Sequence, residues 1–174
     1  MNSKTVASSR TVMTELVMPN DTNPLGDLMG GNLMRWMDIA AGICAARHCE
    51  AHAVTASVDH VSFRRPIHLG NVLTITASVT CAFNTSIEIF IKVATGNVTQ
   101  GDMHVSNHAY MTFVALDPYT HKPKTVPKVK PETEQEIKLC DGAARRRELR
   151  LMLAGRMEVK DAVEIKAMFL ETED

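Results

Sequence analysis

The chain has 174 residues, and its 19 lysine and arginine side chains nearly balance its 20 aspartates and glutamates. This length fits one domain with a short appendage, and the balance disfavours a nucleic-acid carrier, which usually has a strongly basic face. Residues 1–125 hold 18 charged side chains, whereas the much shorter stretch 126–174 holds 21. We therefore expect an apolar domain over residues 1–125 and a charged, helical C-terminal extension over residues 126–174.

The four cysteines, Cys44, Cys49, Cys81 and Cys140, contain no CxxC spacing. In a chain of this size they predict reduced thiols rather than a disulfide framework. The first ten residues lack the apolar segment of a signal peptide. No stretch reaches the ~18 consecutive apolar residues that a membrane helix requires. These features predict a cytoplasmic protein that does not bind a membrane.

Apolar periodicity predicts one long helix between strands. Residues 11–18 are typical of a strand ending at Pro19, and residues 19–31 carry the proline, asparagine, aspartate and glycine of a long loop that is a candidate for function. From residue 32 to about residue 49, apolar side chains cover nearly every face of a predicted helix, which is therefore buried. Residues 53–65, 71–81, 86–95 and 103–116 alternate as antiparallel strands do, and a phase slip predicts a bulge near Asp59 and His60.

A single sheet packed against one helix is an α+β arrangement. Because the helix is too apolar for its outer side to face water, we expect a second subunit to cover part of it. Residues 132–156 are typical of one or two surface helices, broken at Gly142, and a second amphipathic stretch follows over 159–170. The run 145–147 consists of three arginines, but its acidic neighbours favour a solvated helix face or a subunit contact over a nucleic-acid site.

Asp38 is a carboxylate within this otherwise apolar helix. Burial of an ionised carboxylate is costly unless it is paired or hydrogen-bonded. An ion pair with Arg35, one turn earlier, is one interpretation. The other is a general base in a buried site, and the residue pattern alone supports both equally.

Two features before Asp38 have a structural and a functional interpretation. Gly30 and Gly31 either turn the chain into the helix or let a ligand approach the unpaired N–H groups of its first turn. Those groups, at the positive end of the helix dipole, can hold an oxyanion or polarise a carbonyl. Asn23 either caps its own turn before Pro24 or orients a water molecule or a carbonyl.

The remaining candidates are basic or metal-binding. Arg64 and Arg65 at a strand end are either phosphate ligands or ordinary surface charge. Cys44, His48 and His52 share a predicted helix face but lack a second close-spaced ligand pair, so we expect no metal. The HExxH, GxSxG, GxGxxG and phosphate-loop patterns are absent, which disfavours zincin, α/β-hydrolase, dinucleotide-binding and P-loop proteins.

In their order along the chain, these pieces resemble the hotdog-fold acyl-CoA thioesterases, specifically the cytosolic acyl-CoA hydrolase group. The resemblance covers about residues 11–153. Its motifs are residues 17–24 (VMPNDTNP), 30–38 (GGNLMRWMD), 40–42 (AAG), 57–63 (SVDHVSF), the Pro66 and Gly70 pair, 84–86 (NTS) and 113–117 (FVALD).

The resemblance implies a long central helix wrapped by a curved antiparallel sheet. It implies dimers joined edge to edge, which assemble into trimers of dimers. It also implies an active site between subunits, with the asparagine at Asn23 and the aspartate at Asp38 coming from opposite protomers. Acyl-CoA is the implied substrate, so that coenzyme A is part of substrate and product and no separate cofactor is expected.

The implied reaction is hydrolysis of a thioester without a serine nucleophile. The backbone N–H near Gly31 polarises the carbonyl, and Asp38 activates a water molecule or attacks directly. Asn23 positions the water or the carbonyl. The pantetheine arm lies near Ser57 and Val58, and the nucleotide phosphates face Arg64, Arg65, Asn84, Thr85 and Ser86. The alternatives are a non-catalytic acyl-CoA sensor with the same fold, and a hotdog dehydratase, which would need a histidine that residues 19–38 do not contain.

Overall fold

The computed structural model describes residues 3–59, 61, 63 and 65–170. It divides the chain into two compact units, residues 1–130 and residues 131–174. The expected domain boundary after residue 125 stays a prediction; the structure includes the short strand β7 (Lys128–Lys130) in the first unit, where it pairs in parallel with β1 (Ser3–Thr5).

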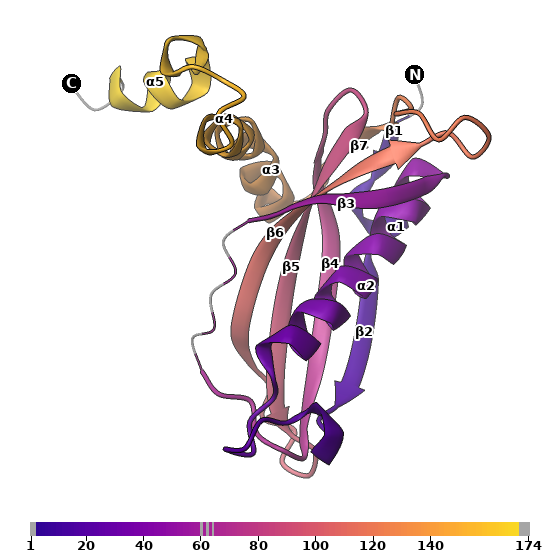
Figure 1. Cartoon of the computed structure of the whole chain (residues 1–174), viewed down its shortest axis with the longest axis vertical. Coiled ribbons are helices and arrows are strands. Elements are labelled where there is room, and N and C mark those ends of the chain that lie inside the picture. Colours follow the sequence, from indigo (N-terminus) through magenta and orange to yellow (C-terminus); the bar gives the residue numbers. More distant parts are fainter. Residues whose placement is uncertain (1–2, 60, 62, 64, 171–174) are drawn as a thin grey trace. The chain divides into compact units, whose positions relative to one another are not determined.

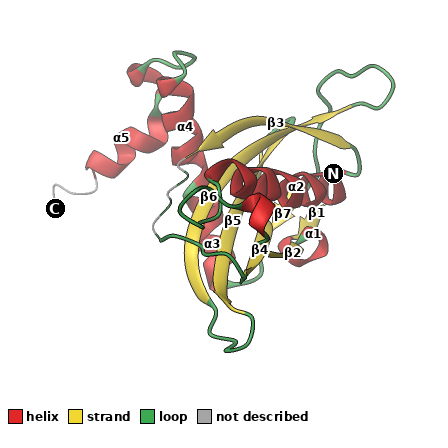
Figure 2. Cartoon of the chain, turned by 60° about the horizontal axis from the view of Figure 1, so that its bottom comes forward, coloured by secondary structure: helices red, strands yellow, loops and turns green. Residues whose placement is uncertain are grey.

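The first unit is a five-stranded antiparallel sheet around one long helix (Figure 1). The helix is α2 (Gly30–Cys49), and the views agree that the strands bend around it (Figure 2). In sheet order the strands are β2 (Thr11–Leu16), β4 (Asn71–Ala82), β5 (Ser86–Asn97), β6 (His104–Leu116) and β3 (His52–Asp59). This confirms the expected α+β hotdog architecture.

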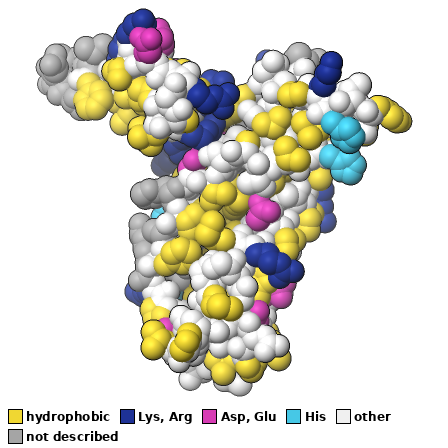
Figure 3. Space-filling model, viewed as in Figure 1, with side chains coloured by type: hydrophobic (Ala, Val, Ile, Leu, Met, Phe, Trp, Pro, Cys, Tyr) yellow, Lys and Arg dark blue, Asp and Glu magenta, His cyan; other side chains and the backbone are white. Residues whose placement is uncertain are grey.

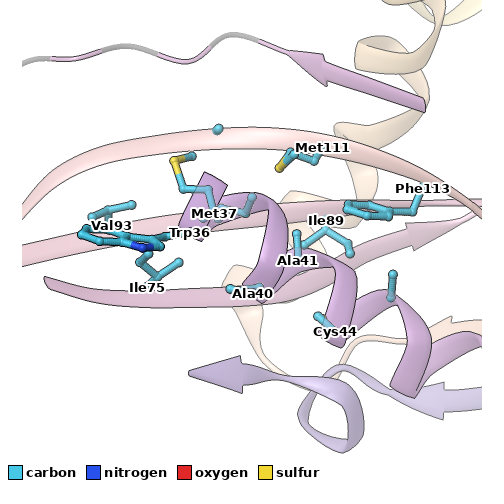
Figure 4. Close-up of a cluster of buried hydrophobic side chains, with 14 of the residues drawn as sticks. Trp36, Met37, Ala40, Ala41, Cys44, Ile75, Ile89, Val93, Met111 and Phe113 are labelled. Carbon is cyan, nitrogen blue, oxygen red and sulfur yellow. The ribbon is translucent and has the colours of Figure 1, made fainter. Parts of the chain in front are cut away.

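Helix α2 is buried along one side against the concave face of the sheet. The side chains on this side of the helix face the strands in Figure 4 and are each at most 6% exposed. They are those of Trp36, Met37, Ala40, Ala41 and Cys44. The helix begins two residues earlier than predicted, at the glycine pair. It ends at Cys49, because the next residue, Glu50, has a φ of 49° and leaves the helical region.

Strand β3 departs from the prediction in its length and its bulge. It ends at Asp59, not at residue 65, and it pairs with β6, so that β5 and β6 separate it from β4. The bulge falls between Thr55 and Ser57. The register is regular from Ser57 to Asp59, so the expected bulge is not seen at Asp59. His60, the other residue of that expectation, lies outside the described residues.

Four short elements among the described residues of the first unit have no periodic signal in the sequence. Besides β1 and β7, these are α1 (Val6–Ser9) and the 3₁₀ turn η1 (Pro19–Asp21). Segments of three or four residues are too short to show an apolar repeat, and their positions depend on what they pack against.

The second unit consists of α3 (Glu134–Asp141), α4 (Ala143–Leu153), the 3₁₀ turn η2 (Val159–Asp161) and α5 (Val163–Leu170). The predicted break at Gly142 is confirmed. The carboxylate of Glu148 accepts hydrogen bonds from the backbone N–H groups of Glu164 and Ile165, at 3.1 and 2.9 Å. A side chain of α4 thereby satisfies the unpaired donors at the start of α5. In the described part of the chain, no helix is long and apolar enough to cross a membrane.

Candidate active site

Asp38 lies on α2, half-buried, and accepts a hydrogen bond from the hydroxyl of Thr55 on β3. The Thr55 Oγ1 to Asp38 Oδ1 distance is 2.6 Å, typical of a hydroxyl bound to a carboxylate. Arg35 is exposed, and the ion pairs of the described residues do not include one between Arg35 and Asp38. The structural alternative raised by the sequence is therefore not the arrangement that forms.

The bulge in β3 explains how Thr55 reaches Asp38. Thr55 pairs with Phe113 and Val58 pairs with Met111, and both partners belong to the core beneath α2. Directly paired residues lie on the same face of a sheet, so Thr55 and Val58 both face the helix. In a regular strand two residues three positions apart face opposite sides; the extra bulge residue brings them onto one side.

Ser57 lies on the other face of β3 from Val58. It pairs with Thr112, and its hydroxyl donates to the carboxylate of Asp59. Of the two strand residues expected near the pantetheine arm, Val58 is thus the one whose side chain lines the pocket at Asp38.

A pocket of about 310 Å³ adjoins Asp38. It is lined by Gly31, Met34, Arg35, Met37 and Asp38 of α2, by Val58 of β3, by Val61 and by Met111 of β6. The first hydrogen bonds of α2 are donated by Asn32 and Leu33, both to the carbonyl of Met29. The N–H groups of Gly30 and Gly31 precede this ladder, so the first turn presents donors at one end of the pocket that Asp38 lines two turns further along the helix.

Gly31 leaves open space at this pocket. A Cβ added there would meet nothing within 4 Å, whereas one added at Gly30 would lie 3.3 Å from the Phe63 ring. The two glycines therefore differ: Gly30 allows Phe63 to pack against the backbone, and Gly31 keeps the surface of the pocket free for a ligand.

Asn23 lies in the loop before α2. Its side-chain oxygen accepts from the N–H groups of Leu25 and Asp27, at 2.9 and 3.2 Å, which is the turn-capping interpretation. These bonds also orient the NH₂ group of the side chain. Asn23 is not among the residues that line the Asp38 pocket, so a single chain does not bring the two candidates together.

The expected phosphate-binding residues are divided between two ends of the sheet. Arg65 is exposed and lies beside Asn71 and Asn97, which pair at one end of the β4–β5 hairpin. Residues 84–86 lie at the other end of that hairpin, in and just after the turn that joins β4 to β5. Strands of this length separate the two ends by roughly 35 Å. Arg64 lies outside the described residues.

The side chains of Cys44, His48 and Cys49, near the end of α2, are buried. Because α2 ends at Cys49, His52 lies on β3, off the helix face on which the spacing had placed it. His48 is fully buried with Nε2 3.0 Å from the carbonyl oxygen of Pro127, and burial lowers its pKa. Burial likewise raises the pKa of the Cys44 and Cys49 thiols to about 11. Among the described residues, no cluster of three or more histidine, cysteine or acidic side chains is arranged to hold a metal.

Comparison with known proteins places this site in a family. Residues 25–101 match the model of the thioesterase superfamily. The chain is 42% identical over 138 residues to YkhA of Bacillus subtilis, named as an uncharacterized acyl-CoA thioester hydrolase, covering 79% of this chain and 80% of that protein.

Solved structures agree with this match. An apo-hexameric acyl-CoA thioesterase superposes with a TM-score of 0.85 at 37% identity, over 88% of this chain and 98% of that chain. The acyl-CoA hydrolase of Staphylococcus aureus, solved with butyryl coenzyme A and coenzyme A, superposes with a TM-score of 0.82 at 37% identity, over 95% and 99%. Structures of that enzyme also include variants in which an asparagine, an aspartate or a threonine is replaced by alanine. The chain therefore belongs to the hotdog-fold acyl-CoA thioesterases of the thioesterase superfamily.

Proposed function

We propose that this protein hydrolyses acyl-CoA to the free acid and coenzyme A, with Asp38 as the general base or the nucleophile. The observation that carries the proposal is one pocket lined both by the Asp38 carboxylate, oriented by Thr55, and by Gly31 in the first turn of α2. The N–H of Gly31 polarises the thioester carbonyl and stabilises the oxyanion that forms on attack. Asp38 then either takes the proton of a water molecule or attacks the carbonyl carbon itself.

The spacing of three residues supports these assignments. In the Staphylococcus aureus variants, the substituted asparagine precedes the substituted aspartate by 15 positions, and the threonine follows the aspartate by 17. Asn23, Asp38 and Thr55 have the same two spacings in this chain. The agreement favours one site built from these three residues, although Thr55 carries no signal of its own in the sequence.

Asn23 reaches the thioester from a second subunit in this proposal. Strand β3 is the last strand of the sheet, so one of its edges is open. Exposed apolar side chains accompany that edge: Met34, Ile39 and Ile43 on α2, and Val54 and Val58 on β3. Figure 3 shows apolar side chains across the face that carries α2 in Figure 1. An edge strand with such a surface is a site for pairing with another copy of the chain, and we propose a dimer that assembles further into a trimer of dimers.

The proposed dimer also accommodates the coenzyme. The pantetheine arm runs along β3 past Ser57 and Val58 towards the pocket. Arg65 lies at one end of the sheet, and the turn at Asn84, Thr85 and Ser86 lies at the other end. In this proposal, the Arg65 that contacts the phosphates of one coenzyme A therefore belongs to one protomer, and the turn that contacts them belongs to its partner. Arg64 is proposed to bind the phosphates together with Arg65. The free state of all four cysteines supports a cytoplasmic location. Neither a further cofactor nor a nucleic-acid or membrane partner is part of the proposal.

Replacement of Asp38 tests the proposal directly. We expect the wild type to release free thiol from acyl-CoA and the Asp38→Asn variant to lose about 10²–10⁴-fold in kcat, because the amide cannot take a proton. Asn23→Ala should also lose most of the activity. Since Asp38 is only half-buried, circular dichroism and melting of the variant should match the wild type.

Two results would contradict the proposal. Turnover of Asp38→Asn at the wild-type rate would remove Asp38 from the reaction. Tight binding of acyl-CoA by the wild type without any thiol release would favour the alternative, a non-catalytic acyl-CoA sensor on the same fold.

A further inference from the structure

The pocket at Asp38 has a polar rim and an apolar interior. Gly31, Arg35 and Asp38 recur at helical spacing along one face of α2 and form the polar side. The other five lining residues are Met34, Met37, Val58, Val61 and Met111. None of these five carries an aromatic ring or a charge. The part of a ligand that fills the interior is therefore apolar, while its reacting group remains at the rim.

The apolar side chains that line the pocket differ in their exposure to solvent. Met34 and Val58 are 40% and 39% exposed, whereas Met37 and Met111 are 1% and 2% exposed. Figure 4 shows Met37 on α2 and Met111 on β6 in the space between the helix and the sheet. Beyond Met111 the core continues, because the strand neighbour of Met111 on β5 is Ile89, which is fully buried. Met37 and Met111 thus form the inner end of the pocket.

Methionine is a suitable lining residue for a pocket that binds an unbranched aliphatic chain. Its side chain is unbranched and has three rotatable bonds, so it fills irregular space and adapts to a ligand of varying shape. The volume of about 310 Å³ lies at the small end of the range for ligand sites, which is roughly 300–1,000 Å³.

We infer that this pocket binds the acyl chain of the substrate, that the chain is straight and of short to medium length, and that Met37 and Met111 set its upper limit. The inference rests on the proposed thioester hydrolysis and adds the acyl class to it. With the thioester carbonyl at Gly31 and Asp38, the methyl end of the chain points towards the two buried methionines. A longer chain meets their side chains and the core behind them.

The test is the dependence of kcat/KM on chain length over straight-chain esters from acetyl- to palmitoyl-CoA. For Met37→Ala and Met111→Ala we expect the optimum to move to longer esters. The ratio of kcat/KM between the next longer ester and the wild-type optimum should rise about tenfold, as one or two methylenes in an apolar pocket contribute. Met111→Leu conserves volume and should retain the wild-type profile.

Ile75→Ala is the matched control. Ile75 is fully buried in the same core but does not line the pocket, so its replacement lowers the melting temperature without moving the optimum. An unchanged profile in folded, active Met37→Ala and Met111→Ala would overturn the inference. So would a wild-type preference for aromatic acyl groups.

Failure of the proposed function has a different signature. If the wild type hydrolyses no ester, the dissociation constants of the same esters, measured by calorimetry on the wild type and the two alanine variants, still test the pocket. The chain length of tightest binding should then move to longer esters in the variants. An unmoved affinity profile would overturn the inference in that case as well.

Discussion

At the scale of single residues, the hydroxyl of Thr55 fixes the orientation of the Asp38 carboxylate. Asp38 would be free to adopt several rotamers on the surface of α2, but the 2.6 Å bond from Thr55 holds one of its oxygens. The other oxygen remains for a proton or a carbonyl carbon. Thr55 therefore acts as a positioning residue in the proposed reaction.

Loss of the Thr55 hydroxyl should lower kcat more than it alters KM. A hydrogen bond to a charged group contributes about 1.5–3 kcal/mol, so Thr55→Val, which keeps the branched shape, should reduce kcat roughly 10- to 100-fold. Thr55→Ser retains a hydroxyl and should recover most of the rate. Steady-state kinetics of both variants checks this, and a Thr55→Val enzyme with wild-type kcat would show that Asp38 needs no such orientation.

His48 determines a second property of the protein at this scale, its response to acid. Burial lowers its pKa in the folded state below the ordinary 6.5, and its Nδ1 is buried without a hydrogen-bond partner among the described atoms. Below pH 6.5, His48 therefore binds a proton more readily in the unfolded chain than in the folded chain. The folding stability falls as the pH falls for this reason. Above pH 6.5 both states are neutral at this residue and the contribution is constant.

A glutamine at this position should remove that dependence. The amide nitrogen of Gln takes the place of Nε2 and can still donate to Pro127, but it does not titrate. We expect the melting temperature of the wild type to fall relative to His48→Gln between pH 7 and pH 5. Scanning calorimetry at several pH values measures the difference, and parallel curves would show that His48 is protonated as easily in the folded chain as in the unfolded one.

At the scale of elements, helix α2 carries both the core and the site, and its glycines serve different purposes. Gly31 lies in the first turn beside the pocket, and Gly42 lies in the middle of the helix, where an added Cβ would touch the Phe113 ring at an ordinary 3.8 Å. Alanine is sterically possible at both positions. Only one of them faces the proposed substrate.

The pair Gly31→Ala and Gly42→Ala separates folding from catalysis. Gly42→Ala should stabilise the protein by about 0.5–1 kcal/mol, because glycine inside a helix costs that much, and should leave activity unchanged. Gly31→Ala should fold equally well but lose activity, since its methyl group occupies the place of the thioester carbonyl. Thermal melts and thiol-release rates test the pair; full activity of Gly31→Ala would mean that the carbonyl lies elsewhere.

At the scale of the whole molecule, the proposed site is complete only in an assembly. One chain supplies Asp38, Thr55 and Gly31, while Asn23 is held in a separate loop. The open edge of β3 and the exposed apolar side chains of α2 are the surface that a second copy would cover.

A charge placed on that surface should separate the subunits. Ile43 is 41% exposed in the single chain, so Ile43→Glu leaves the fold intact but places an unpaired carboxylate in the proposed interface. We expect smaller species in sedimentation velocity and a loss of thiol release. Val98→Glu, at a site 56% exposed in the hairpin between β5 and β6, is the matched control. An assembled, active Ile43→Glu protein would place the interface on another surface.

The sequence alone was sufficient for the features that depend on local pattern. The buried helix, its single carboxylate at Asp38, the alternating strands and the break at Gly142 all follow from side-chain periodicity and from glycine, which act over a few neighbouring residues. For the same reason the α+β architecture could be predicted before the structure was known.

The tertiary structure alone decided how distant segments meet. The pairing of β3 with β6, the bulge after Thr55 and the separation of Arg65 from residues 84–86 result from strand register, which depends on contacts between segments far apart in the chain. One extra residue in β3 turns Thr55 towards Asp38, and no local pattern marks that residue. The carboxylate was therefore predictable from the sequence, whereas the hydroxyl that orients it depends on the fold.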